Sequence, residues 1–290
     1  MYKYTQYISL ALLMVLIFLG QPKAQQPLRR FLQPASVVNQ IPYGANPKAG
    51  HYAQSGDARI YYEVYGKGQP FVLLHGGLFG SSIEMASFID SFSKNYQVIV
   101  ISTRGHGKSE LGTTALTLPQ RATDVFNVVK GVTNEKLTLL GFSDGGYTAY
   151  QFGAMFPDKV KKMIVIGAGE LYPGVRTFGF TSKQAFELDK VYWNQQLLLM
   201  PQPERIEELF QQIANCYNKL TVGKELLGAI KCPVLVMAGD RDDGNPVQRV
   251  LNAAVLIPNH QLSIIPNVGH PAFLDNFAAV WTAMLPFIKD

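Results

Sequence analysis

The feature that most constrains the fold is a short stretch near the middle of the chain, Lys136–Ala149, with the sequence KLTLLGFSDGGYTA. Its first half is an apolar run of the length expected for a buried strand, and the residues after Gly146 can form a helix. Between them Ser143 lies in a turn rich in glycine. Neighbours with a Cβ would collide in so tight a turn, and the turn pushes the serine hydroxyl into the open. The stretch therefore predicts the strand, turn and helix of a nucleophile elbow.

The rest of the chain alternates between short apolar runs and helical stretches. The expected strands are 51–54, 58–65, 71–74, 98–101, 137–140, 163–166, 234–237 and 262–265, and the expected helices are 81–94, 119–132, 147–156, 246–256 and 271–288. The first two strands should pair across the turn at 55–57. Strands that alternate with helices and are apolar on both faces predict an α/β fold with a mostly parallel, doubly wound sheet.

Two segments fall outside this alternation. Residues 170–231 are too many for a loop and contain helical patterns at 181–200 and 203–220, so they predict a helical cap inserted into the core. The core itself then comprises 51–169 and 232–290. Residues 25–50 are rich in Pro, Gln and Asn and have no periodic apolar pattern, which predicts a linker or an arm wrapped on the surface.

The N-terminus has the features of a targeting segment. Lys3 is followed by the apolar run Ile8–Leu19, which suits the h-region of a signal peptide better than a membrane span of about 20 residues. We expect residues 1–24 to be a signal peptide cleaved after Ala24, with an uncleaved anchor as the alternative. The protein should then be exported, periplasmic or extracellular, with no stable membrane insertion after cleavage. In an oxidising compartment Cys216 and Cys232 could form a disulfide or remain two buried thiols.

Composition excludes several classes of partner. The 290 residues carry 26 Lys and Arg against 21 Asp and Glu, and the basic residues are scattered, so nothing indicates nucleic acid. Neither cysteine has the spacing of a metal ligand, and the glycines at 145–146 do not complete a dinucleotide fingerprint. We therefore expect a small-molecule substrate and no cofactor or metal, while the oligomeric state is left open.

Polar groups follow several of the expected strands. In parallel sheets the functional sites lie at the carboxyl ends of the strands. The candidates there are His75-Gly76-Gly77, Ser143, the acids Asp240, Asp242 and Asp243, and His270. A serine hydroxyl is a poor nucleophile at neutral pH unless a base accepts its proton and a carboxylate orients that base. The chain order Ser, Asp, His is the one expected for this architecture.

Five motifs in a fixed order carry a resemblance to a known family. They are His-Gly-Gly at 75–77, Arg-Gly-His-Gly-Lys-Ser at 104–109, Gly-Phe-Ser-Asp-Gly-Gly at 141–146, Gly-Asp-Arg-Asp at 239–242 with Pro246 downstream, and Gly-His at 269–270. Over about 52–289 the chain resembles the α/β-hydrolase fold family. The resemblance implies Ser143 as nucleophile, His270 as general base and then acid, and Asp242 as the orienting carboxylate. In the family the acid follows the Gly by three residues and precedes the Pro by four, as Asp242 does; Asp240 and Asp243 are the alternatives.

Two backbone N–H groups should form the oxyanion hole. The turn geometry directs the N–H of Asp144 at the attacked carbonyl oxygen. The resemblance supplies Gly77 as the second donor, with Leu78 as the alternative, and gives the Asp144 side chain no chemical role. The other histidines are less suited as the base. His51 precedes the core, His260 precedes the last strand at the far end of the sheet, and His75 and His106 lie in glycine turns that the family uses structurally.

The sequence thus predicts a secreted serine hydrolase that cleaves a small-molecule carboxylic ester or lactone through an acyl-enzyme on Ser143. Serine at the elbow argues against the family's epoxide hydrolases and dehalogenases, which use aspartate. A carbon–carbon bond hydrolase, a cofactor-free perhydrolase or a non-catalytic ligand-binding homologue are alternatives. So is an aminopeptidase, because 75–80 resembles the loop of proline iminopeptidases, although the Pro after its second Gly is missing. Cap carboxylates for amine recognition are available at Glu187, Glu204, Glu207 and Glu208.

Overall fold

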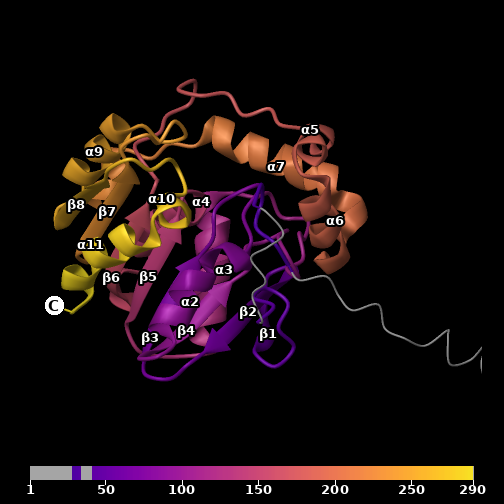
Figure 1. Ribbon diagram of the computed structural model, residues 1–290, viewed down its shortest axis with the longest axis horizontal. Helices are drawn as coiled ribbons and strands as arrows, with labels where there is room; N and C mark the ends of the chain where they lie inside the picture. Colours follow the sequence, from indigo (N-terminus) through magenta and orange to yellow (C-terminus); the bar gives the residue numbers. More distant parts are fainter. Residues whose placement is uncertain (1–27, 34–40, 290) are drawn as a thin grey trace, which may run out of the picture.

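The structure is a computed structural model that describes residues 28–33 and 41–289 (Figure 1). The expected signal peptide, 1–24, lies outside the described residues. Within the described ranges no helix combines the length and the apolar character needed to cross a membrane.

The core is an eight-stranded sheet with strand order β1-β2-β4-β3-β5-β6-β7-β8. β1 pairs antiparallel with β2 and β2 with β4, and every later pairing is parallel. The strands are β1 (Gly50–Ser55), β2 (Ala58–Tyr65), β3 (Gln69–Leu74), β4 (Tyr96–Ile101), β5 (Leu137–Phe142), β6 (Val160–Ile166), β7 (Val234–Gly239) and β8 (His260–Ile265). Each expected strand is present, and the mostly parallel sheet is confirmed.

Successive residues of β3 belong to different cores, because side chains alternate between the two faces of a strand. Val72 and Leu74 pack in one apolar cluster, while Phe71 and Leu73 pack in the other. The first cluster is covered by α3 (Leu118–Lys130), α4 (Asp144–Met155) and α9 (Val247–Leu256), and the second by α2 (Ala86–Phe92) and α11 (Phe277–Lys289). The doubly wound prediction is therefore also confirmed (Figure 1).

Two expected helices are interrupted. Residues 81–94 form a short 3₁₀ turn, Ser82–Met85, followed by α2. Residues 271–288 form α10 (Ala272–Asp275) and α11, separated by Asn276, whose backbone angles of φ −147° and ψ 80° are not helical. The Asn276 side chain accepts a hydrogen bond from the N–H of Ala279 at 3.0 Å. Asparagine is a preferred N-cap residue, so it starts a new helix where the apolar pattern alone predicts continuity.

The segment between β6 and β7 contains four α-helices, and the three labelled in Figure 1 lie over one end of the sheet or beside it. They are α5 (Ser182–Leu188), α6 (Lys190–Leu199), α7 (Ile206–Lys219) and α8 (Lys224–Gly228). The buried residues of α7 form one stripe, in which each has another member three or four positions away: Leu209, Phe210, Ile213, Ala214 and Tyr217. This stripe faces inward, as expected for an amphipathic helix on a core.

A buried arginine fixes the loop that follows β4. Arg104 donates from Nε and Nη2 to the two carboxylate oxygens of Asp124 on α3, at 2.9 and 2.7 Å, and from Nη1 to Asp57 at 2.8 Å. Its side chain is fully buried. A bidentate guanidinium–carboxylate pair of this kind is both strong and directional. Arg104 therefore ties the loop to α3 and to the β1–β2 turn.

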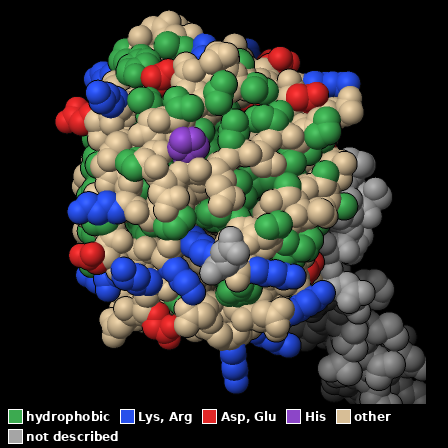
Figure 2. Space-filling model, turned by 90° about the vertical axis from the view of Figure 1, so that its left-hand side faces the viewer, with side chains coloured by type: hydrophobic (Ala, Val, Ile, Leu, Met, Phe, Trp, Pro, Cys, Tyr) green, Lys and Arg blue, Asp and Glu red, His purple; other side chains and the backbone are tan. Residues whose placement is uncertain are grey.

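β8 forms the exposed edge of the sheet. Figure 2 views this side of the molecule, where hydrophobic side chains lie among polar ones and Lys and Arg gather in the lower half. The exposed apolar residues of α9 and β8 include Leu251, Val255 and Leu262. The sequence predicts a last strand covered on both faces, but five of the six residues of β8 remain at least partly exposed. An edge strand has one neighbour, so more of its surface stays accessible.

Candidate active site

Ser143 lies between the end of β5 and the start of α4, with backbone angles φ 51° and ψ −112°. A non-glycine residue rarely adopts a positive φ, so this is a strained position. The close packing of the turn maintains it. A Cβ on Gly141 would lie 2.2 Å from the carbonyl oxygen of Gly145, and one on Gly145 would lie 2.4 Å from that of Leu74. Only glycine fits at these two positions, as the sequence predicts.

A chain of hydrogen bonds joins Ser143 to two residues from other strand ends. His270 follows β8, and its Nε2 lies 2.8 Å from the Ser143 Oγ. Its Nδ1 lies 2.8 Å from Oδ2 of Asp242, which follows β7. The Asp242 side chain is fully buried, and its other oxygen accepts the N–H of Asn245 at 2.6 Å. The structure thus brings together the three side chains that the resemblance implies.

The alternative acids lie elsewhere. Asp240 accepts a hydrogen bond from the N–H of Val268 at 3.2 Å and so links two loops, and Asp243 is exposed. Sequence reasoning did not single out Asn245. Its side-chain oxygen accepts the Tyr147 hydroxyl at 2.6 Å, which holds the Asp242 loop against α4. Its position three residues after Asp242 is the signal that could have indicated a turn around the carboxylate.

The other histidines do not contact Ser143. His75 is completely buried, and its Nε2 accepts the N–H of Thr103 at 3.0 Å. Burial lowers the pKa of His75 to about 3 and that of His106 to about 4, so both rings are neutral. His51 is exposed on β1. His260 is the first residue of β8 rather than a residue before it, and still lies at the opposite end of that strand from His270.

The two expected oxyanion donors belong to segments that touch. A Cβ on Gly77 would lie 2.8 Å from the Cβ of Asp144, so the loop after β3 approaches the first turn of α4 closely. Leu78, the alternative donor, has a φ of 22°. The N-terminus of a helix provides free N–H groups and a favourable dipole for a developing negative charge. The arrangement offers such a place beside Ser143, and we treat the donor roles of Gly77 and Asp144 as a proposal.

Comparison with known proteins agrees with this architecture. The family model described as "alpha/beta hydrolase fold" matches residues 69–202. The chain is 24% identical to mouse "Serine hydrolase BPHL" over 76% of this chain and 81% of that protein. The chain has the α/β-hydrolase fold. It is also 23% identical to the "2-hydroxy-6-oxo-6-(2'-aminophenyl)hexa-2,4-dienoic acid hydrolase" of Metapseudomonas resinovorans, over 82% of this chain and 90% of the relative.

A solved structure supports the same fold. The serine hydrolase "Involved in the Carbazole Degradation (CarC enzyme)" superimposes with a TM-score of 0.70 at 23% identity, covering 83% of this chain and 98% of that one. The relatives named as hydrolases identify this protein as an α/β-hydrolase enzyme.

The Asp144 side chain has a structural partner in this α/β-hydrolase that the sequence did not indicate. Its carboxylate forms a buried ion pair with Arg121 of α3. Burial by itself would raise the pKa of Asp144, but the Arg121 charge and the hydrogen bonds from Tyr217 and Arg121 together outweigh it, and the pKa is lowered. A signal was available, because Arg121 occupies the helical register of the buried apolar residues Leu118 and Val125. A cation in such a register needs a buried counter-ion.

A cavity of about 320 Å³ opens beside Ser143 and His270. Its lining is rich in aromatic side chains, among them Tyr217. Two arginines and one glutamate from outside the triad also line it, namely Arg30, Arg176 and Glu84. The four cap glutamates considered for amine recognition do not line it. Glu207 accepts hydrogen bonds from Ser182, and Glu208 pairs with Arg205. The carboxylates that the aminopeptidase alternative requires are therefore directed elsewhere.

Three further features concern metal ligands, the cysteines and a second cavity. Across the described ranges, no three His, Cys, Asp or Glu side chains converge as a metal site would require. Cys216 and Cys232 are both free thiols, and of the two only Cys232 is buried, whereas Cys216 is half-buried. A larger cavity of about 490 Å³ is lined by Cys216 and residues of α3 and α7, but it does not border Ser143.

Proposed function

We propose that this α/β-hydrolase is an exported serine hydrolase that cleaves a carboxylic ester or lactone of a small molecule through an acyl-enzyme on Ser143. The observation that carries the proposal is the hydrogen-bonded series from the Ser143 Oγ through both ring nitrogens of His270 to the buried Asp242, with 2.8 Å at each step. The family supports hydrolysis as the reaction, and the ester or lactone and the export are our own additions.

In the first half-reaction His270 takes the proton of Ser143 at Nε2 as the Oγ bonds to the substrate carbonyl carbon. The Asp242 carboxylate accepts from Nδ1–H and stabilises the imidazolium. The N–H groups of Gly77 and Asp144 stabilise the oxyanion, and the imidazolium gives its proton to the departing alkoxide. Water then repeats the sequence on the acyl-enzyme, which releases the acid and restores Ser143. Each step conserves protons without an added co-reactant.

A carbon–carbon bond hydrolase is the second candidate, because one relative over most of the chain is named as a hydrolase of a dienoic acid. The two candidates share Ser143 and differ in the leaving group, which is an alcohol in one and a carbanion equivalent in the other. Comparing kcat/KM for a panel of aryl esters and lactones with that for a vinylogous diketone separates them. Faster turnover of the diketone by orders of magnitude would replace our first choice.

The decisive experiment traps the acyl-enzyme. We expect a fluorophosphonate probe to label the purified protein, and intact-mass analysis after mixing with an activated ester to show one acyl group, located on Ser143. Ser143→Ala should lose both signals, while Ser81→Ala at a buried serine outside the triad keeps them. Labelling that persists in Ser143→Ala would refute the mechanism. Saturable ligand binding without any acylation would favour a non-catalytic homologue.

Export is tested separately. We expect the mature protein to be recovered outside the cytoplasm with an N-terminus near Gln25. Full-length protein that stays with the membrane fraction would instead indicate an uncleaved anchor.

A further inference from the structure

The arm 28–33, part of the segment 25–50 for which the sequence predicts a linker or an arm on the surface, is fastened to the cap. Arg29 forms an ion pair with Asp189 at 2.6 Å, and the N–H of Leu32 donates to the same carboxylate oxygen at 2.8 Å. The other Asp189 oxygen accepts the N–H of Tyr192 in the first turn of α6. Asp189 is 6% exposed, so one buried carboxylate joins the arm to the start of α6.

Phe31 packs against the loop that follows β3. The Phe31 ring stacks on Phe79 with centroids 4.4 Å apart and meets the edge of Tyr192 at 5.4 Å. Stacked and edge-to-face aromatic pairs add to the free energy gained by burial. Since Phe79 is two residues beyond the proposed oxyanion donor Gly77, the arm contacts the very loop that borders the reactive carbonyl. Phe31 itself lines the cavity beside Ser143.

Between these two anchors, Arg30 also lines the cavity. Among the residues that the structure describes, none accepts a hydrogen bond from its guanidinium or forms an ion pair with it within 4.0 Å. The acid in its neighbourhood is Glu84, whose carboxyl accepts the N–H of Gly76. Burial raises the pKa of Glu84 to about 8, against the opposing effects of that hydrogen bond and Arg30. Near pH 7 Glu84 is therefore mostly neutral and leaves the Arg30 charge uncancelled.

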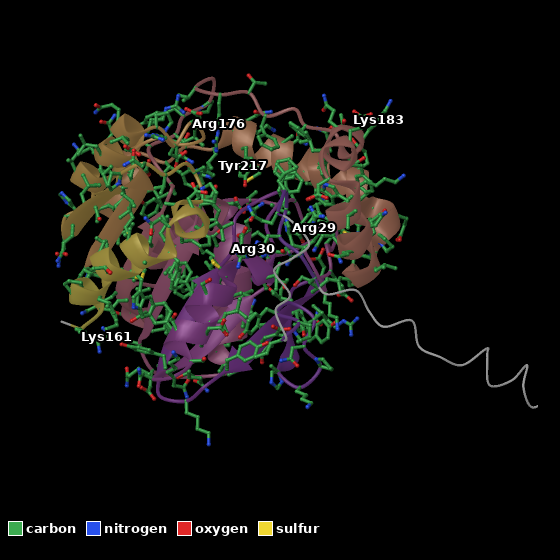
Figure 3. The ribbon with its side chains drawn as sticks, in the orientation of Figure 1. Arg29, Arg30, Lys161, Arg176, Lys183 and Tyr217 are labelled. Carbon is green, nitrogen blue, oxygen red and sulfur yellow. The ribbon has the colours of Figure 1, made fainter. Side chains whose placement is uncertain are left out.

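A second guanidinium reaches the same cavity from the loop after β6. Arg176 donates from Nη1 to the carbonyl oxygen of Gly244 at 3.0 Å and lies 5.7 Å from the ring centroid of Tyr217. Its Nε is buried and has no partner within the described part of the chain. Figure 3 shows Arg176 and Tyr217 close together beneath this loop, with Arg30 below them on the side of the sheet.

We propose that the arm 28–33 forms a wall of the substrate pocket and that Arg30, with Arg176 as a second cation, binds a carboxylate carried by the ester or lactone substrate. This inference rests on the hydrolase function proposed above and names its substrate class. A guanidinium fork matches the two oxygens of a planar carboxylate, and aromatic walls exclude the water that would weaken the pair. The expected cleavage after Ala24 leaves Arg30 in the mature protein.

The test compares substrates that differ by one carboxylate. On the acyl side the pair is the 4-nitrophenyl monoester of glutarate and 4-nitrophenyl pentanoate, and on the alcohol side it is 4-carboxyphenyl butyrate and 4-methylphenyl butyrate. We expect the parent enzyme to favour the anionic member of at least one pair. Arg30→Gln should lower the ratio of anionic to neutral kcat/KM by about tenfold to a hundredfold, mainly through KM, and Arg30→Lys should recover part of it.

The controls remove the same charge from exposed sites. Lys161→Gln and Lys183→Gln, both labelled in Figure 3, should keep the parent ratio. A loss of equal size in these variants would indicate a general field effect and overturn the assignment of Arg30. The assignment would also be overturned if the ratio of anionic to neutral kcat/KM in Arg30→Gln stayed within twofold of the parent ratio.

A binding measurement keeps the test independent of turnover. In a Ser143→Ala background, calorimetry with the glutarate monoester should show a Kd that rises at least tenfold on adding Arg30→Gln. Failure of fluorophosphonate labelling would remove the hydrolase proposal and leave this result standing. Active enzyme without any dependence on Arg30 would remove the present inference alone.

Discussion

The Asp144 carboxylate pairs with the Arg121 guanidinium in the protein interior, one residue beyond the strained Ser143. The pair ties the first turn of α4 to α3, and the Tyr217 ring of α7 lies 6.0 Å from the same guanidinium. The turn that carries the nucleophile is thus connected to both the core and the cap. This connection has a measurable consequence for stability.

Asp144→Asn should destabilise the fold strongly. The substitution leaves the Arg121 charge buried without its partner, and breaking a buried pair on one side typically costs about 3–5 kcal/mol. Urea unfolding measures the free energy change. Glu208→Gln is the matched control, because it breaks an exposed pair with Arg205 and should cost less than about 1 kcal/mol. Equal effects of the two substitutions would contradict the structural role of the buried pair.

Asp242→Asn should lower kcat by about 10³–10⁴ while the protein stays folded. The amide can no longer accept the Nδ1–H of His270 with a full charge, so the tautomer and the imidazolium lose their support. Asp243→Asn, at the exposed neighbour, should keep kcat within about twofold of the parent. Steady-state kinetics on an activated ester distinguishes the two. If Asp243 proved the more sensitive position, the orienting acid would have to be reassigned.

Gly145→Ala should disrupt the elbow. The added Cβ would lie 2.4 Å from the backbone oxygen of Leu74, which cannot move without shifting β3. We expect a loss of several kcal/mol in the free energy of unfolding, in the upper range for overpacking. Gly179→Ala is the control, because a Cβ there meets nothing within 4 Å. A Gly145→Ala protein as stable as the control would show that the turn is looser than described.

Stability should fall on the acid side of about pH 6.5. His75 and His106 have folded pKa values of about 3 and 4 because burial disfavours the charged ring, whereas the unfolded value is about 6.5. The unfolded chain therefore binds more protons as the pH drops, and the native state loses stability. Glu84 partly offsets this effect, and the net loss over the whole range from pH 6.5 to 5 should be on the order of 1 kcal/mol. In urea unfolding, the free energy of unfolding of His106→Asn should fall less steeply below pH 6.5 than that of the parent.

Stability should also fall on the alkaline side, and Glu84 is the cause. Burial raises its folded pKa to about 8, above the value of about 4.5 for a free glutamate, so its contribution is complete below pH 4.5 and is lost as the pH rises to 8. Glu84→Gln keeps an acceptor for the N–H of Gly76 and removes the titration. We expect its unfolding free energy to rise slightly between pH 6.5 and 8, because His75 and His106 still act, whereas that of the parent declines. A parallel decline in both proteins would contradict the raised pKa.

Much of the fold follows from local patterns. Apolar runs of strand length, separated by helical stretches, predicted the strands from β3 to β8. Alternation of apolar and other residues predicted β2, and pairing across the turn at 55–57 predicted β1. One prediction failed where two local signals compete. At Asn276 the apolar pattern predicts a continuous helix, but the capping side chain of the asparagine divides it. The anchoring of the arm to the cap is a feature that the sequence did not indicate. Residues 28–33 have no periodicity to reveal that Arg29 would meet Asp189, which is 160 positions further along the chain.

The sequence by itself determined the elbow around Ser143, because glycine at 141 and 145 is a steric requirement that any chain adopting this turn must meet. It also determined the order of the candidate groups along the chain. Only the tertiary structure decided which acid faces His270 and which cations line the pocket. Those contacts join residues far apart in sequence, and their partners are set by how the strand ends, the cap and the arm pack together.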